Sequence, residues 1–255
     1  MLAWITVLRP VACGSAALMV ILSYYISGQP IDWLLVVTTY TIATTAMVLN
    51  NYHDRYIDIE KGILGIHSQR AFRAYASAWS ILSLTICIFI GFTRTPGQSL
   101  VAWSMLFLSL TYDYIRPIYT LNNLYVAIAT SLPLLFPSTY NSYWLASTIF
   151  CLIFGREIIK DILDVKHDLP YKLTLPIRIG NREAEEVAIT LYASAYCLIN
   201  GVNPISAGSI LLNIAISLVI LIIIHLYVKS THNKLRFLDA LTGIHLAWLW
   251  LMFFL

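Results

Sequence analysis

Carboxylates gather in two clusters, each at the end of an apolar stretch. The first cluster is NNYHDRYID, residues 50–58, in which Asn50, Asp54 and Asp58 recur at intervals of four. Residues four apart lie on the same face of a helix. Carboxylates held this close repel each other and are costly to dehydrate near a membrane. The spacing therefore predicts a partner that offsets this cost.

The second cluster is GREIIKDILDVKHD, residues 155–168. On a helix its acids form one continuous stripe, at positions i, i+4, i+7 and i+11: Glu157, Asp161, Asp164 and Asp168. Arg156 and Lys160 flank the stripe and could pair with some of the acids. One interpretation is therefore a solvated helix end with ion pairs, and the other is a functional site.

The two clusters together favour a site for a hard cation. Mg²⁺ takes oxygen ligands and is usually held by one or two carboxylates plus the phosphates of a substrate. Asn50 would add a neutral oxygen. The chain has no Gly-rich Walker loop, which argues against a nucleoside triphosphate. A diphosphate carried on a lipid tail fits better, because both clusters lie where cytosol is expected to meet the bilayer.

The elements that carry these residues are predicted to span a membrane. The chain of 255 residues is 59% hydrophobic and 11% charged, against about 25% charged for a soluble domain. A spanning helix needs about 20 apolar residues. Nine candidate spans satisfy this approximately: 3–27, 32–52, 72–92, 98–114, 121–138, 142–162, 182–200, 205–228 and 236–254. The expected fold is an all-α, multi-pass integral membrane protein, with one domain over residues 1–255 and a retained first helix.

Basic residues predict the orientation of this bundle. The even-numbered connections and their flanking helix ends hold 14 of the 16 Lys and Arg residues, whereas Arg9 and Arg94 lie elsewhere. The positive-inside rule places the N-terminus in the cytoplasm and both acidic clusters at the cytoplasmic face. The four cysteines are widely separated and predict neither a disulfide framework nor a zinc site. No nucleic-acid partner is expected.

These motifs, in this order, resemble the UbiA superfamily of intramembrane prenyltransferases. That family has Asp-rich motifs of the form NDxxDxxxD and DxxxDxxDxxxD at the cytoplasmic ends of its second and sixth helices. Further similar segments are LRP at 8–10, TYDYIRPIYTLNNLYVA at 111–127 and LTLPIRIGNREA at 173–184. The text REIIKD is closest to the branch that includes digeranylgeranylglyceryl phosphate synthases and chlorophyll synthases. Departures are Asn51 and Glu157 in place of Asp, His167 in place of Gly, and a missing NxPxRP stretch.

The resemblance implies ionisation of an isoprenyl diphosphate, of geranylgeranyl or farnesyl type, and transfer of the prenyl group to a lipophilic or aromatic acceptor. It implies Mg²⁺, with Mn²⁺ as a possible substitute. The implied metal ligands are Asn50, Asp54, Asp58, Glu157, Asp161, Asp164 and Asp168. The candidate diphosphate contacts are Arg116, Lys172, Arg178 and Arg70, the last as the remnant of the missing NxPxRP stretch. The positive-inside rule explains the presence of Arg116, Lys172 and Arg178 in these connections equally well.

Catalytic roles are expected for four residues. Asp54 and Asp161 belong to the metal site. The face of Tyr112 would stabilise a developing prenyl cation. Beside it, Asp113 would either orient a basic residue or accept a proton.

Two other functions are compatible with the sequence. A UbiA-type terpene cyclase would ionise the same donor without an acceptor. An ion transporter or channel would line its path with the acids, but both clusters fall at one face of the membrane and no charges continue across it.

Overall fold

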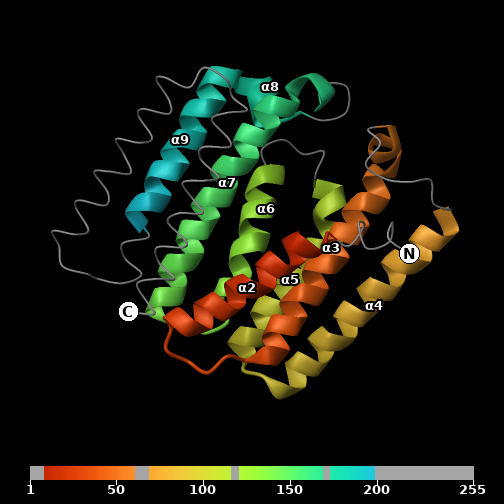
Figure 1. Cartoon of the computed structure of the whole chain (residues 1–255), viewed down its shortest axis with the longest axis vertical. Helices are drawn as coiled ribbons and strands as arrows, with labels where there is room; N and C mark the ends of the chain where they lie inside the picture. The colour runs from red at the N-terminus through yellow and green to blue at the C-terminus, as the bar shows by residue number, and fades with distance from the viewer. Residues whose placement is uncertain (1–8, 61–68, 116–120, 169–172, 199–255) are drawn as a thin grey trace. The chain divides into compact units, whose positions relative to one another are not determined.

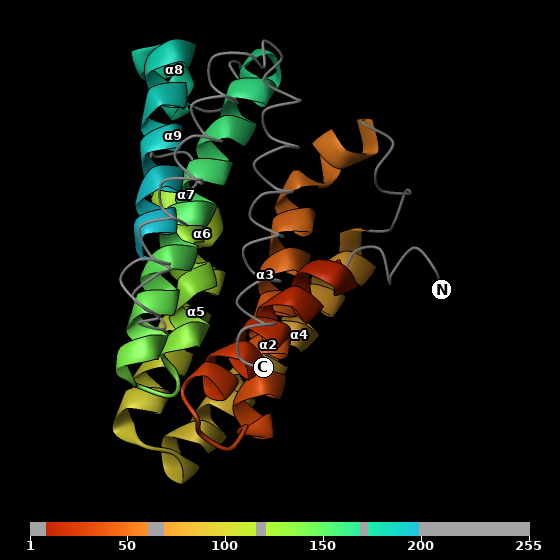
Figure 2. The same cartoon turned by 60° about the vertical axis from the view of Figure 1, so that its left-hand side comes forward.

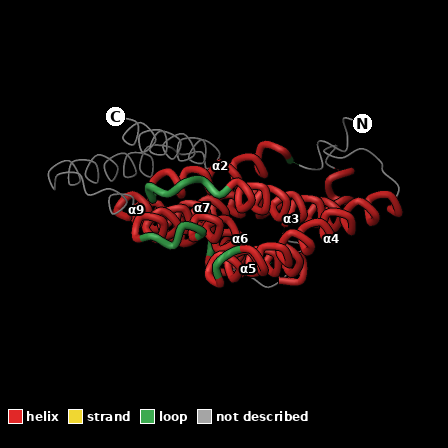
Figure 3. The backbone as a smooth tube through the Cα atoms, turned by 90° about the horizontal axis from the view of Figure 1, so that it is seen from below, coloured by secondary structure: helices red, strands yellow, loops and turns green. Residues whose placement is uncertain are grey.

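The computed structural model describes residues 9–60, 69–115, 121–168 and 173–198. Within these ranges all regular structure is helical, and Figure 3 shows helices joined by loops without a strand. The predicted all-α class is therefore confirmed for the described part of the chain. The predicted spans at 205–228 and 236–254 lie outside it.

The chain folds into two compact units. The first comprises Met1–Ile115 and Leu132–Ser138, and the second comprises Arg116–Ser131 and Thr139–Leu255. The expectation of one domain over residues 1–255 stays a prediction.

In the first unit, α3 (Trp33–Glu60) packs against three other helices, namely α2 (Pro10–Ile26), α4 (Gln69–Thr93) and α5 (Pro96–Ile115). Figure 1 shows α3 in orange beside α2 in red and α4 in gold. Apolar side chains from all four helices form the core, and they include Val20, Leu35, Ile42, Ile90 and Leu106.

Buried threonines make α3 compatible with an apolar surrounding. The hydroxyl of Thr38 donates to the carbonyl of Leu34 at 2.7 Å, and Thr39, Thr41, Thr44 and Thr45 bond the carbonyl four residues earlier in the same way. Each hydroxyl is thus satisfied within its own helix. The hydroxyl of Thr45 also lies 2.8 Å from that of Ser83, which joins α3 to α4.

A short segment from later in the chain completes the first unit. Its 3₁₀-helix, η1 (Leu132–Leu135), packs against α2 and α5. The hydroxyl of Ser23 donates to the carbonyl of Leu134 at 2.6 Å, and the amide of Gln98 donates to the carbonyl of Phe136 at 3.5 Å. The predicted span 121–138 is thus α-helical over Leu121–Ser131 and continues as the 3₁₀-helix η1 over Leu132–Leu135. Pro133, followed by Pro137, ends the helix because proline cannot continue the α-helical hydrogen bonds.

Two described helices are long and apolar enough to cross a membrane, by length and composition: Trp33–His53 and Phe72–Thr93. The second exposes large apolar side chains, with Ile81 at 63% and Phe92 at 87%. Exposed apolar surface of this extent, continued at Leu82, Leu84, Ile88 and Phe89, is the pattern of a helix that faces lipid.

The second unit centres on α7 (Tyr140–Asp168), which contacts α6 (Leu121–Ser131), α8 (Leu175–Ile179) and α9 (Asn181–Leu198). Figure 2 shows α9 in blue running alongside α7 in green. A Cβ added at Gly155 would lie 3.0 Å from both the carbonyl of Ala188 and the ring of Tyr192. The absence of a side chain at Gly155 is what allows α7 and α9 to approach so closely.

Candidate functional site

The first acidic cluster lies on the last turns of α3. This helix continues to Glu60, beyond the predicted end at 52, so that residues 50–58 are helical as the spacing predicted. We name the positions of Asn50, Asp54 and Asp58 the α3 carboxylate stripe. The side chain of Asn50 is half-buried, and those of the two aspartates lie outside the described part.

Asn51, the residue where the resemblance expects an acid, is 2% exposed and accepts a hydrogen bond from Arg9. The bond joins Nη2 of Arg9 to Oδ1 of Asn51 at 2.9 Å. Arg9 precedes Pro10 and adopts a left-handed backbone (φ 45°), while its carbonyl accepts the amide of Ala12 at the start of α2. The contact thus ties the start of α2 to α3. Sequence reasoning gave Arg9 no role.

The second acidic cluster lies entirely on α7, which extends to Asp168. We name its four positions the α7 carboxylate stripe: Glu157, Asp161, Asp164 and Asp168. Glu157 is paired on both sides, with Arg156 Nη1 at 3.2 Å and Lys160 Nζ at 3.5 Å. The interpretation of this cluster as ion pairs is thus correct for Glu157. Its charge is already balanced by protein.

Asp161 is buried more deeply than Glu157 and Asp164, the other acids of the stripe whose side chains the structure describes, because it is only 5% exposed. Its Oδ2 accepts a hydrogen bond from Nδ2 of Asn123 at 2.9 Å, and Asn123 lies on α6 and is itself 1% exposed. A buried carboxylate is costly unless donors compensate its charge. The contact fixes the orientation of Asp161, and Asp164 follows one turn later with a half-buried side chain.

The described donors around Asp161 fit a hard cation rather than a soft one. The amide oxygen of Asn123 is buried and has no hydrogen-bond partner among the described atoms. Oxygen donors suit Mg²⁺. In the described ranges no three His, Cys, Asp or Glu side chains converge as a complete metal cage. Mg²⁺ sites that rely on substrate phosphates need only one or two carboxylates.

The other predicted site residues are distributed as follows. Arg178 is exposed in the last turn of α8, and Tyr112 is half-buried in the last turn of α5. Asp113 also lies on α5, while Asp168 ends α7, and the side chains of both are outside the described part. Arg70 is exposed near the start of α4. Arg116 and Lys172 lie outside the described residues.

The segment before α9 has a backbone that requires glycine. Gly180 has φ 101° and ψ 152°, a conformation essentially reserved for glycine, and a Cβ there would clash with the carboxylate of Glu183. This backbone conformation explains why the segment LTLPIRIG ends in a glycine. It sets the sharp turn that separates Arg178 on α8 from α9.

The chain belongs to the UbiA prenyltransferase family, whose family model matches residues 13–254. Members of this family are membrane proteins, and its enzymes generally depend on a metal ion. Two curated relatives are both digeranylgeranylglyceryl phosphate synthases. The one from Methanothermobacter thermautotrophicus is 29% identical over 191 residues, which is 70% of this chain and 67% of the relative. The one from Methanosphaera stadtmanae is 28% identical over 199 residues, 74% of this chain and 73% of the relative.

Solved structures share the fold. One comes from a study of digeranylgeranylglyceryl phosphate synthase in membranes and has a TM-score of 0.71, with 21% identity and 98% of each chain covered. A UbiA homologue from Archaeoglobus fulgidus bound to Cd²⁺ has a TM-score of 0.63, with 16% identity over 99% of this chain and all of that one. A UbiA homologue from Aeropyrum pernix has a TM-score of 0.67, with 14% identity over 94% of this chain and 98% of that one.

Proposed function

We propose that this membrane prenyltransferase transfers a geranylgeranyl group from its diphosphate to a hydroxyl of a prenylated glyceryl phosphate. The environment of Asp161 is the observation that carries the proposal. Its carboxylate belongs to the acidic stripe of α7, is buried, and accepts a hydrogen bond at 2.9 Å from the buried amide of Asn123. The named relatives supply the acceptor, since both are synthases of digeranylgeranylglyceryl phosphate. The geranylgeranyl chain length and the acceptor are parts of the proposal.

The reaction breaks one bond and forms another. The allylic C–O bond of the donor breaks, and its electron pair leaves with the diphosphate. The acceptor hydroxyl oxygen forms the new ether bond to the prenyl carbon and loses its proton. Tyr112 is proposed to stabilise the positive charge on that carbon through its ring face, and Asp113 is proposed as the acceptor of the proton.

In this proposal the two carboxylate stripes hold Mg²⁺, with Asp54 and Asp161 as the principal ligands. Mg²⁺ neutralises the charge that develops on a leaving diphosphate. Asn123 keeps the Asp161 carboxylate in one orientation, so that little reorganisation is needed during the reaction. Arg116, Lys172 and Arg178 are the proposed contacts to phosphate oxygens. The active site would open to the cytoplasm, in a bundle of about nine spanning helices.

The test is an assay of purified protein with Mg²⁺, geranylgeranyl diphosphate and geranylgeranylglyceryl phosphate. We expect the diether product together with one diphosphate per turnover. Asp54→Ala and Asp161→Asn should each lower turnover at least about 100-fold while the protein stays folded. The control Glu186→Gln removes an exposed carboxylate from α9 and should leave turnover unchanged.

Other outcomes would contradict the proposal. Hydrocarbon or terpene alcohol formed from the donor alone would identify a terpene cyclase. Full activity of Asp161→Asn would remove the metal-site argument. Ion flux in liposomes that survives Asp54→Ala, without prenyl transfer, would support a transporter.

A further inference from the structure

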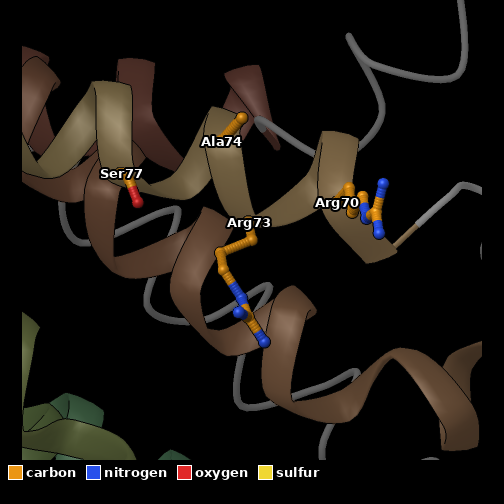
Figure 4. A pocket seen from close by; sticks show the side chains of 4 residues that line it. All are labelled: Arg70, Arg73, Ala74 and Ser77. Atoms are coloured by element: carbon orange, nitrogen blue, oxygen red, sulfur yellow. The ribbon is translucent and has the colours of Figure 1, made fainter.

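A groove runs along the contact between the last turns of α3 and the first turns of α4. Its first part has a volume of about 460 Å³, and Figure 4 shows the four side chains that line it, all from α4: Arg70, Arg73, Ala74 and Ser77. Its second part, of about 410 Å³, shares Arg73 and Ser77 with the first, so we treat both as one feature, the α3–α4 groove. The remaining lining residues are Leu49, Tyr52, His53, Ala76, Ser80 and Ile81.

One end of the groove is cationic. Arg70 and Arg73 are both exposed, and none of the lining residues that belong to the described part of the chain is acidic. In Figure 4 the Arg73 side chain extends from α4 towards α3, where its Nε donates to the hydroxyl of Tyr52 at 3.4 Å. Guanidinium groups bind phosphate in a bidentate manner. The start of α4 adds the positive end of a helix dipole on the same side.

The other end of the groove is apolar. Beyond Ser77 and Ser80 the lining changes to Leu49 and Ile81, and Ile81 is 63% exposed. The same surface of α4 continues into the exposed apolar side chains of its second half. A ligand that fits this gradient has a phosphate at one end and a hydrocarbon chain at the other.

The groove lies on a different face of α3 from the proposed metal site. Leu49 and Tyr52 line it and by helical register lie roughly opposite Asp54, the middle position of the α3 carboxylate stripe, whereas the third lining residue of α3, His53, lies between the two faces. A phosphate in the groove would therefore be separated from a diphosphate at that stripe by the body of α3.

We infer that the α3–α4 groove binds a phospholipid of the surrounding bilayer, with its phosphate on Arg70 and Arg73 and its acyl chain along Leu49 and Ile81. Basic pockets between membrane helices commonly receive lipid head groups in this way. The inference moves Arg70 from the diphosphate contacts to a separate lipid site. It does not depend on the prenyl transfer reaction.

The experiment is native mass spectrometry of the full chain in detergent, titrated with dioleoyl phosphatidic acid, dioleoylglycerol or inorganic phosphate. We expect phosphatidic acid to bind at least about tenfold more tightly than dioleoylglycerol, which lacks the phosphate, and inorganic phosphate to compete poorly. Arg73→Gln should weaken phosphatidic acid binding about tenfold, and Arg70→Gln/Arg73→Gln should weaken it further. Arg73→Lys should restore part of the affinity, because it keeps the charge.

The matched control is Arg182→Gln, which removes one exposed charge from α9 and should leave lipid binding unchanged. The inference would be overturned if Arg182→Gln weakened phosphatidic acid binding as much as Arg73→Gln does. It would also be overturned if dioleoylglycerol or inorganic phosphate bound as tightly as phosphatidic acid. A rise in the KM for prenyl diphosphate in Arg70→Gln, with lipid binding intact, would return Arg70 to the diphosphate site. Lipid binding that persists in Asp161→Asn separates this test from any failure of the proposed function.

Discussion

Asn123 and Asn51 each use a buried amide to hold a charged side chain. Asn123 donates to Asp161 on α7, and Asn51 accepts from Arg9 beside α2. An amide can do this without adding a charge to a buried position, where a second carboxylate or a lysine would be costly. Both contacts orient groups at the ends of helices that carry the proposed chemistry.

Replacing Asn123 by Leu should lower turnover about tenfold or more, because a hydrogen bond to a charged group is worth about 1.5–3 kcal/mol. The Mg²⁺ concentration that gives half-maximal rate should rise as well, since Asp161 loses its orienting donor. Asn122→Leu is the control, because it removes the neighbouring buried amide, which is 7% exposed, and leaves the hydrogen bond from Asn123 to Asp161 in place. An unchanged Mg²⁺ requirement in Asn123→Leu would contradict the positioning role.

The helical stripe of acids on α7 could be predicted from its spacing, but these asparagine contacts could not. Helical periodicity places Asp161 and Asp164 on one stripe from the sequence alone. The contact from Asn123 joins residues 38 positions apart, and its geometry depends on how α6 packs against α7. The sequence signals were a pair of asparagines inside an apolar stretch and their place in the segment 111–127 that resembles the family.

At the scale of elements, the close packing of α7 and α9 depends on one glycine. Gly155→Ala should lower the free energy of unfolding by about 1–3 kcal/mol, because the new Cβ would crowd a carbonyl and a buried ring. Gly91→Ala on α4 is the control, since its nearest neighbour would be Trp103 Nε1 at 3.9 Å. Thermal unfolding in detergent measures both, and a Gly155→Ala protein as stable as the control would refute the argument.

The start of α3 depends on Asp32, which caps the helix and pairs with Arg94. Its Oδ1 accepts the amide of Leu34 at 3.1 Å, and its Oδ2 lies 2.6 Å from Nε of Arg94. Asp32→Asn keeps an acceptor for the cap but removes the ion pair with Arg94, and it should lower the free energy of unfolding by about 1 kcal/mol. Asp32→Ala should cost about 1 kcal/mol more through the lost cap.

The hydrogen bond to Asp32 raises the pKa of Arg94 above its ordinary value. A group whose pKa is raised by folding stabilises the folded state fully at pH values below its pKa in the unfolded chain. This contribution is lost only as the pH rises through its pKa in the folded protein. Arg94 therefore stays charged from about pH 6 to about pH 10. The free energy of unfolding that Asp32→Asn removes should be constant across that range. Unfolding in urea at several pH values measures this, and a loss that shrinks towards pH 10 would contradict it.

Most described helices could be predicted from apolar length, whereas their ends could not. The helices α4 and α5 agree with the predicted spans to within a few residues. The ends of α3 and α7 extend well past the apolar stretch, because a helix continues into polar sequence when its backbone bonds remain satisfied. α8 is only five residues long, too short to be predicted from apolar periodicity.

At the scale of the molecule, the distribution of basic residues predicts an N-terminus in the cytoplasm. In a chain with Cys151 and Cys197 replaced by Ser, a cysteine at Thr95 should react with an impermeant maleimide added outside intact cells. A cysteine at Asn181 should react only after permeabilisation. Both positions are exposed in the structure, so the reverse pattern would mean the opposite orientation.

The segment Leu132–Ser138 belongs to the first unit although the chain on both sides of it belongs to the second. No single cut can therefore separate the units. A fragment that stops at Ile115 would leave the hydroxyl of Ser23 and the amide of Gln98 without the carbonyls they bond here. During synthesis, the first unit cannot be completed until the ribosome has also produced α6. The order of translation thus makes the halves of this protein obligate partners in folding.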